Sequence, residues 1–392
     1  MRKGWEYKKL GEVGKIVTGS TPSTKDESNY SPREYCFVKP SDLPSQGIAD
    51  IEETEYYVSQ VGLSKSRVLP VGSVLVSCIG SIGKIGILTK EACSNQQINA
   101  IIPQDEIDSR FIAYSLYAQR FVLESIANAP VVPIINKTVF SKITIGIPPR
   151  STQLAIVSEL DKINELIRLK KEQLKDFDNL AQSLFYEMFG DPVENEKGWE
   201  VKKLGEICEV TSAKRVFIDE VVESGVPFIR GTELTALSKL VPGEKMDYTL
   251  FITYEHYERL KAITGVPKIG DLLIPSINAD GIVWMVDTED PLYFKDGRVL
   301  WVHVNHEYYN SIAIQKLMNV LIKNVFTSMG GATFAELKLF VLRNMNVPTP
   351  PLSIQDAFSE KIKQIDAQKL QVKKSIQDLE TLLASRMQYW FE

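Results

Sequence analysis

The sequence repeats itself, and this duplication limits the folds open to the chain more than any other feature. Residues 4–13 read GWEYKKLGEV and residues 198–207 read GWEVKKLGEI, which gives eight identities in ten positions at an offset of 194. Residues 147–153 and 349–355 share the pattern PPxSxQ at an offset of 202. A repeat at a nearly constant offset is typical of tandem structural units. The chain is therefore predicted to contain two related halves.

Each half is predicted to end in a long helix, 149–190 and 349–392. After each Pro-Pro pair, apolar residues recur at alternating steps of four and three, interrupted by lysines or an arginine at Lys170, Lys369 and Arg386. This spacing is that of a coiled-coil seam. The predicted seam residues are Ile156, Leu160, Ile163, Ile167, Leu174 and Phe177 in the first helix, and Phe358, Ile362, Ile365, Val372, Ile376 and Leu379 in the second.

The seams leave two packing arrangements open. Each helix could lie on its own globular domain, or the two helices could pair with each other. A narrow and long apolar stripe favours a partner helix. Two similar units in one chain can close about a pseudo-two-fold axis, so we expect an antiparallel pair that separates two heads.

The two heads, residues 1–148 and 191–348 with its entry linker, are predicted to be α+β domains with a mixed, largely antiparallel sheet. Short apolar runs bounded by turns predict their strands. These runs are 35–38, 68–69, 73–76 and 98–102 in the first head, and 227–230, 270–274 and 299–304 in the second. Helices are expected at 108–127 and 311–325.

Composition excludes several classes of protein. The chain has 392 residues, 44% of them hydrophobic, and a formal net charge of −5, so it is neither wholly disordered nor able to coat nucleic acid through bulk positive charge. No apolar run is long enough to cross a bilayer, and no signal peptide is evident. The four cysteines form no CxxC pair. We therefore expect a cytoplasmic protein without membrane contact and with reduced, mostly buried thiols.

Catalytic and metal-binding signatures are weak. The segment 78–84, CIGSIGK, lacks the first glycine of a phosphate-binding loop, and Ile85 follows Lys84 where a serine or threonine belongs. A turn is the better interpretation. His303 and His306 would point to opposite faces of a strand, and the first head has no histidine. We predict no catalytic residue, no metal site and no cofactor in this chain.

Polar residues on predicted loops favour recognition of nucleic acid instead. Arginine and lysine can hydrogen-bond guanine, while asparagine and glutamine can pair with adenine. The candidates are Thr18, Gly19, Ser20, Thr21, Lys39, Ser41, Lys84, Asn95, Gln96 and Gln97 in the first head, and Lys214, Arg215, Arg230, Thr232, Asn278 and Arg298 in the second. For any single one of them, a solvated loop residue is the alternative interpretation.

The doubled WExKKLGE opening, the TGSTP loop at 18–22, NQQIN at 95–99 and the PPxSxQ segment before each helix resemble the specificity subunit of type I restriction-modification enzymes. The resemblance covers essentially the whole chain. It implies two target-recognition domains, an antiparallel pair of helices and a bipartite double-stranded DNA target. The second head departs from the pattern, because TSAKR at 211–215 replaces the TGSTP loop.

The resemblance also implies partners that carry the chemistry. These are two modification subunits that use S-adenosylmethionine to methylate adenine, and restriction subunits that use ATP. Since the loops of the two heads differ, the target is expected to be asymmetric. Two alternatives remain open from the sequence: a coiled-coil scaffold whose heads bind protein, and a stand-alone modification enzyme.

Overall fold

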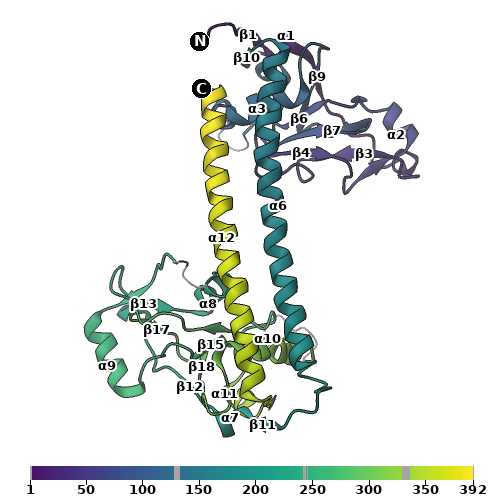
Figure 1. Cartoon of the computed structure of the whole chain (residues 1–392). Coiled ribbons are helices and arrows are strands. Elements are labelled where there is room, and N and C mark those ends of the chain that lie inside the picture. Colours follow the sequence, from purple (N-terminus) through teal and green to yellow (C-terminus); the bar gives the residue numbers. More distant parts are fainter. Residues whose placement is uncertain (1, 128–132, 242–243, 245, 329–335, 392) are drawn as a thin grey trace. The chain divides into compact units, whose positions relative to one another are not determined.

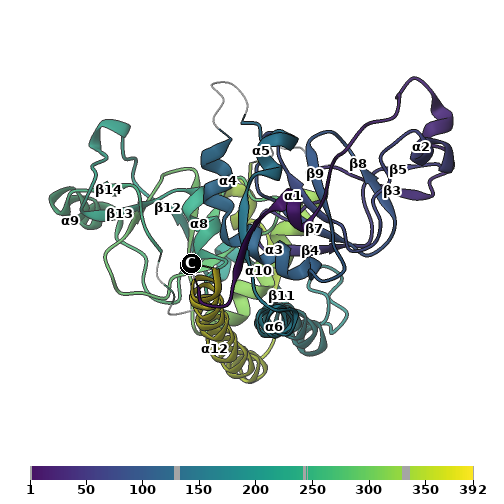
Figure 2. The ribbon, with the colours of Figure 1, turned by 90° about the horizontal axis from the view of Figure 1, so that it is seen from above.

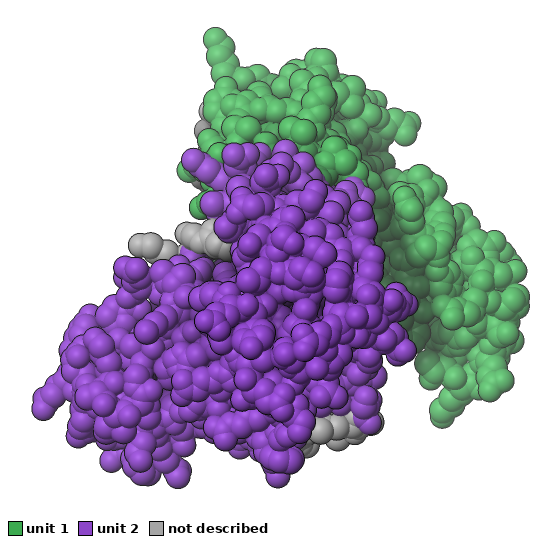
Figure 3. All heavy atoms as spheres, turned by 60° about the horizontal axis from the view of Figure 1, so that its bottom comes forward, with its two compact units in different colours: residues 1–169, 377–392 green, residues 170–376 purple. Residues whose placement is uncertain are grey.

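The computed structural model describes residues 2–127, 133–241, 244, 246–328 and 336–391. The chain forms two compact units, residues 1–169 with 377–392 and residues 170–376 (Figure 3). Each unit holds one head together with a part of both long helices. These helices, α6 (Arg150–Phe189) and α12 (Leu352–Phe391), pass from one unit into the other without a break (Figure 1).

The first unit contains one five-stranded sheet, one three-stranded sheet and a two-stranded ribbon. The five-stranded sheet has the order β2-β9-β6-β7-β4, with β2 (Gly14–Thr18), β9 (Ile98–Pro103), β6 (Val74–Ser77), β7 (Ile85–Leu88) and β4 (Ile48–Ile51). The three-stranded sheet has the order β5-β3-β8, with β5 (Tyr57–Val58), β3 (Tyr35–Val38) and β8 (Ala92–Ser94). The ribbon pairs β1 (Glu6–Lys9) with β10 (Thr144–Ile147). Most pairings are antiparallel; β3 with β8 and β4 with β7 are parallel.

The large sheet of this unit is buried on both faces. On one face, α3 (Ser109–Ala118) packs with α6 and the last turns of α12, and Phe111, Ile156 and Met387 share one apolar cluster. On the other face, Val17 and Leu75 pack against Cys36 of the small sheet. Helix α2 (Gln60–Ser64) lies beside β3 and β5, as Figure 2 also shows. The remaining elements are α1 (Leu10–Val13), η1 (Glu27–Asn29), α4 (Arg120–Ile126) and α5 (Lys137–Ser141).

The second unit repeats this plan. Its larger sheet has the order β12-β18-β15-β16 and its smaller sheet β14-β13-β17. The elements are β11 (Val201–Lys203), α7 (Leu204–Ile207), β12 (Glu209–Ser212), η2 (Ile218–Glu220), β13 (Val226–Ile229), α8 (Gly231–Leu237), β14 (Phe251–Ile252), α9 (Tyr254–Thr264), β15 (Leu272–Pro275), β16 (Trp284–Met285), β17 (Tyr293–Phe294), β18 (Val299–His303), α10 (Ser311–Ser328), α11 (Leu339–Arg343) and β19 (Asn346–Pro348). Strand β13 runs parallel to β17, as β3 does to β8. The predicted duplication and α+β class are confirmed.

The WExKKLGE repeat forms the same strand-to-helix turn in both units. Strand β1 pairs with β10, and β11 pairs with β19. The Glu12 carboxylate accepts a hydrogen bond from the Lys9 amide at 2.9 Å, and Glu206 accepts one from Lys203 at 3.2 Å. Each glutamate satisfies an amide that the start of a short helix leaves unpaired. This shared geometry explains why the segment occurs twice.

The two long helices are antiparallel. In the second unit, Lys369 of α12 contacts Asp178 of α6 at 2.6 Å, while Phe358, earlier in α12, packs edge-to-face against Phe189, later in α6. In the first unit, Arg386 and Trp390 donate hydrogen bonds to Glu159. Residues earlier in α12 thus contact residues later in α6, so the two helices run in opposite directions. The predicted antiparallel pair is confirmed (Figure 1).

The predicted seam residues face inward, and they pack on more than the partner helix. Ile156, Leu160, Phe358 and Ile362 are buried, and they share apolar clusters with the adjoining head as well as with the other long helix. Leu174, Phe177 and Leu379 are only half-buried. The two packing arrangements that the sequence left open therefore occur together.

Two elements differ from their predictions. Residues 68–69, expected as a strand, form only an isolated bridge between Leu69 and Ala92. The helix expected over 108–127 is divided at Gln119 into α3 and α4. Gln119 leaves helical geometry, with φ −92° and ψ 13°. The redirected chain buries Leu123 in the core and leaves Phe121 exposed. Apolar spacing did not show this break, because Phe121 and Val122 continue the apolar stripe in the sequence.

Candidate nucleic-acid interface

Three loop segments predicted to bind nucleic acid meet at one edge of the first unit. They follow the ends of β2, β3 and β8. The Gly19 amide donates to the Ile98 carbonyl at 3.0 Å, and the Ser20 amide donates to the Ser94 carbonyl at 2.8 Å. The Asn95 amide donates to the Val38 carbonyl at 3.1 Å. These bonds bring residues 18–21, 38–41 and 94–97 together.

The side chains at this edge divide into exposed and internally bonded groups. Thr21 donates to the amide oxygen of Gln96 at 2.6 Å, and both residues are exposed. Thr18 instead donates to Asn99 at 2.6 Å. Asn95 is buried and donates to the Gln97 side chain at 2.9 Å. Asn95 thus shapes the loop, while Thr21 and Gln96 are the groups presented at its surface.

The predicted cations Lys39 and Lys84 border the same edge. The Lys84 ammonium donates to the Pro40 carbonyl at 3.3 Å. The Lys39 ammonium lies 3.0 Å from the centre of the Tyr56 ring, which is a cation–π contact. Ser41 is exposed beside them. Residues 78–84 form the loop that connects β6 and β7, and hydrogen bonds from the Gly83 and Lys84 amides to Ser77 close it.

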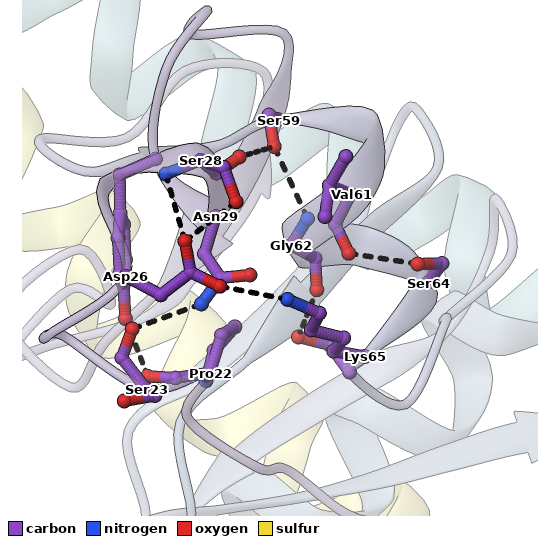
Figure 4. Close-up of polar contacts among 12 residues, drawn as sticks. Pro22, Ser23, Asp26, Ser28, Asn29, Ser59, Val61, Gly62, Ser64 and Lys65 are labelled. Atoms are coloured by element: carbon purple, nitrogen blue, oxygen red, sulfur yellow. Dashed lines mark hydrogen bonds and ion pairs between the residues drawn. The ribbon is translucent and has the colours of Figure 1, made fainter.

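The segment from Pro22 to Asn29 is fixed to α2 by a polar network that the sequence analysis missed (Figure 4). Asn29 donates to the Ser23 carbonyl at 2.9 Å, and the Lys65 ammonium contacts the Asp26 carboxylate at 2.9 Å. The Ser59 amide donates to the Asn29 carbonyl at 2.9 Å, and its hydroxyl caps α2. The loop is therefore built onto the unit rather than being a plain turn.

Gly62 is required for this contact. A Cβ atom at Gly62 would lie 2.1 Å from the Asn29 carbonyl oxygen. No side chain fits at that distance, so the loop and α2 can approach only because this residue is glycine. One signal in the sequence could have indicated this contact, namely the serine at position 59, which caps a short helix.

The second unit presents different groups at the equivalent edge. Lys214 and Arg215 follow β12 and are exposed. The exposed Arg230 makes two hydrogen bonds to Glu233, at 2.7 and 3.1 Å, and Thr232 donates to the same carboxylate at 2.9 Å. Arg298 contacts Glu336 at 3.3 Å. Compared with the polar edge of the first unit, this edge is cationic with acidic partners.

Asn278 does not fit the role predicted for it. Its side chain is 3% exposed. The amide nitrogen donates to the Ile282 carbonyl at 2.6 Å, and the amide oxygen accepts from the Ile282 amide at 2.5 Å. Both halves of the amide therefore close a turn, and Asn278 is a structural residue in this conformation.

Glu233 is predicted to stabilise the second unit in a pH-dependent way. Burial raises the pKa of its carboxyl group, but hydrogen bonds from Arg230 and Thr232 outweigh that effect and lower the pKa from 4.5 to about 2. Folding thus favours the ionised form, so the stabilisation is complete above pH 4.5 and is lost as the pH falls towards 2. We expect Glu233→Gln to lower the unfolding free energy by about 2 kcal/mol at pH 7, measured by urea unfolding.

The pH profile and a control separate this effect from general damage. The difference between Glu233→Gln and the wild type should shrink below pH 4.5. Glu223→Gln, at an exposed glutamate of the same head, should stay within about 0.5 kcal/mol of the wild type. A Glu233→Gln deficit that is independent of pH would contradict the assignment.

The thiols and imidazoles have structural roles. All four cysteines are buried and unbridged, and burial raises the pKa of Cys78 to about 12 and that of Cys93 to about 11. His303 contacts the buried Asp271 at 3.1 Å. No group of three or more potential metal ligands occurs among the described residues. Within that part of the chain, no helix is long and apolar enough to span a bilayer.

Comparison with known proteins places these observations in a family context. The family model "Type I restriction modification DNA specificity domain" matches residues 2–176 and again 196–381. The MjaIX type I restriction enzyme specificity subunit of Methanocaldococcus jannaschii is 25% identical over 390 residues, covering 91% of this chain and 85% of its own. The HindI specificity subunit of Haemophilus influenzae is 29% identical over 207 residues, covering 52% and 40%.

Solved structures share the fold at low sequence identity. The S subunit of the type I restriction-modification system of M. genitalium has a TM-score of 0.56 at 16% identity, covering 98% of this chain and 95% of its own. A chain from a structural study of type I complex assembly and conformational transition has a TM-score of 0.62 at 17% identity, covering 100% and 98%. At these identities, the likeness supports the fold alone.

Proposed function

Because this chain belongs to the type I restriction-modification DNA specificity family, we propose that it is a DNA sequence-recognition subunit that directs partner subunits to an asymmetric, bipartite target. Each head reads one half of the target. The antiparallel helices connect the two readers within one chain.

One observation carries this proposal. Apart from the edge strand β4, which has no counterpart among the described residues of the second unit, the two units share strand order and strand direction. They nevertheless place unlike side chains on the loops at the equivalent edge. Thr21 and Gln96 in the first unit are neutral hydrogen-bonding groups of the kind that pair with base edges. Lys214 and Arg215 in the second unit suit guanine or phosphate. A duplicated scaffold with different contacts reads two different sequences.

The chemistry is proposed to reside in partner subunits. Two modification subunits would bind S-adenosylmethionine and methylate adenine, and restriction subunits would use ATP. Support comes from the family to which this chain belongs, because the model that matches both halves is that of a DNA specificity domain. This chain would therefore contribute recognition rather than a reacting group.

A methylation map tests the proposal. Single-molecule sequencing of DNA from cells that express the full chain with its modification subunits should show one methylated motif made of two unlike halves and a fixed gap. The motif should disappear when this chain alone is deleted. A map that is unchanged by the deletion would overturn the proposal.

Gln96→Ala is predicted to relax recognition in one half of the target only. It removes an exposed amide whose oxygen is already oriented by Thr21 at 2.6 Å. A good bidentate contact contributes about 1–3 kcal/mol of discrimination against the wrong base. Methylation of duplexes with single substitutions should therefore become less selective by about tenfold at one position.

The matched control lies at the other end of the same strand. Gln104 is exposed just after β9, whereas the Gln96 loop precedes this strand. Gln104→Ala should leave discrimination at every position unchanged. Equal relaxation in both variants, or relaxation in both halves of the target, would count against a base contact by Gln96.

A further inference from the structure

The loop that follows the first strand of the large sheet has a different surface in the two units. In the first unit, the loop between β2 and β3 contains η1, and its exposed residues include Thr24, Lys25 and Glu27. In the second unit, the loop between β12 and β13 contains η2, and its exposed residues include Phe217 and Ile218. Phe217 is 55% and Ile218 is 85% exposed. Two adjacent large apolar side chains at this exposure are unusual on a solvated loop.

Three anchors hold this loop in place. The Lys214 amide donates to the Tyr293 hydroxyl at 2.9 Å, and Tyr293 is buried. Val216 is buried in an apolar cluster with Val226 and Tyr257. The Glu220 carboxylate accepts from the Phe217 amide at 2.8 Å. The exposed pair therefore sits on a loop whose backbone is fixed on both sides.

Glu220 also ties the loop to the neighbouring helix. Its Oε1 lies 3.5 Å from Arg259 and 3.6 Å from His256, both on α9. In the first unit, Lys65 and Ser59 tie the corresponding loop to α2. Both loops are thus tied to a neighbouring helix, but the residues exposed on the two loops differ in character. The polar anchors account for the position of Phe217 and Ile218, but not for their apolar character.

Cations flank the apolar pair. Lys214 and Arg215 are exposed, and the Arg215 guanidinium lies 5.0 Å from the centre of the Phe217 ring. The acidic neighbours are Asp219, which is exposed, and Glu220, which has Arg259 beside it. Cations next to an apolar side chain suit a duplex, because phosphates neutralise the cations while the apolar group can enter between stacked bases.

We propose that Phe217 and Ile218 form a wedge that inserts at a base step of double-stranded DNA, with Lys214 and Arg215 holding the adjacent phosphates. This inference rests on the proposed function and deepens it. The second head would then read its half of the target partly through the ease with which one step unstacks. The first head, whose loop carries no such apolar pair at its tip, would read through hydrogen bonds.

Fluorescence of 2-aminopurine tests the wedge. The probe replaces each adenine in turn in duplexes that carry the mapped target, and the protein is the full chain assembled with its modification subunits, without S-adenosylmethionine. Emission should rise at one step in one half of the target. Ile218→Ser and Phe217→Ala should abolish that rise and weaken binding by about tenfold. A rise that persists in both variants comes from base flipping by the modification subunits and not from the wedge.

Two controls separate the wedge from other roles. Ile263→Ser, at a residue of α9 that is also exposed, should change neither emission nor affinity. The double variant Lys214→Gln with Arg215→Gln should weaken DNA binding. The dependence of the binding constant on salt should fall by the equivalent of about two phosphate contacts, while a saturating concentration of protein should still produce the rise in emission.

The outcomes are distinct. Selective binding by the wild type with no rise that depends on Ile218 would overturn the wedge and leave the proposed function intact. Loss of the modification subunits from the Ile218→Ser complex in size-exclusion chromatography, with DNA affinity per assembled complex unchanged, would identify the pair as a protein-docking surface and also overturn the wedge. Failure of the wild-type complex to select any sequence would overturn the proposed function itself.

Discussion

A hybrid chain with two copies of the first head is expected to require a symmetric target. Residues 5–147 would replace residues 199–349, so that both junctions fall in the repeated segments. Identical heads carried by antiparallel helices should read the same half-sequence on opposite strands. Methylation of the original asymmetric site should fall by roughly a thousandfold, because several mismatched base pairs each cost about 1–3 kcal/mol. Methylation rates on synthetic duplexes measure this change.

The hybrid needs two further substitutions, because the heads meet the helices through different polar contacts. In the first unit, Tyr114 of α3 donates to Asp161 of α6 at 2.6 Å, and Asn164 donates to Tyr114 at 3.0 Å. At the same offset of 202, the second unit has Lys363 and Asp366 on α12. The pKa of the half-buried Asp366 is raised, because the effect of burial outweighs the opposing effect of the nearby Lys316 of α10. A transplanted first head would place Tyr114 where Lys316 now lies near Asp366.

Lys363→Asp together with Asp366→Asn should restore the contacts of the first head. Arg110, which contacts Asp161 at 3.4 Å, would otherwise approach a lysine. A hybrid without these changes serves as the control and should melt at a lower temperature. If the corrected hybrid folds and still prefers the original asymmetric site, the assignment of one half-sequence to each head is wrong.

The long-range plan of the fold could be predicted because it depends on periodicity and repetition. The stripe from Ile156 to Ile167 fixes both the helix and its buried face, and it needs no knowledge of the partner. Strand β3 occupies 35–38 as predicted, since a short apolar run between turns has few other solutions. The repeated openings became equivalent strand-to-helix turns. Local sequence was sufficient to predict each of these features.

The site was less predictable, because a polar side chain in a loop can serve either the loop or a ligand. Asn278 was expected at the DNA surface and instead closes its own turn onto Ile282. The following Ala-Asp-Gly is a turn signal that could have indicated this role. The exposure of Phe217 and Ile218 had no signal at all, since only the tertiary position of the loop shows that no core covers them.

Gln153 and Gln355 occupy equivalent buried positions at the start of the long helices, and replacing either is expected to destabilise its unit strongly. The Gln153 oxygen accepts from the Asp108 amide at 2.9 Å, and its nitrogen donates to the Pro148 carbonyl at 3.0 Å. Gln355 makes the same bonds to the Asn310 amide at 2.9 Å and the Pro350 carbonyl at 2.7 Å. One amide thus connects the head helix, the entering chain and the long helix.

Gln153→Leu keeps the approximate shape but leaves the part-buried Asp108 amide and the buried Pro148 carbonyl without this partner. Each unpaired group costs about 1–3 kcal/mol, so the unfolding free energy should fall by about 3 kcal/mol. In a unit of this size, this corresponds to a fall of about 8 °C in Tm, measured by calorimetry. Gln355→Leu should cause a similar loss in the second unit, because the hydrogen bonds are the same.

The matched control is Gln182→Leu, at an exposed glutamine of α6, which should stay within about 0.5 kcal/mol of the wild type. Gln153→Glu provides a second test. An ionised carboxylate can still accept from Asp108 but cannot donate to Pro148, so its deficit should be large at pH 7 and smaller at a pH where the carboxyl group is protonated. If Gln153→Leu is as stable as Gln182→Leu, the Gln153 side chain does not join the head to the helix. The repetition of the PPxSxQ segment in this chain would then need another explanation.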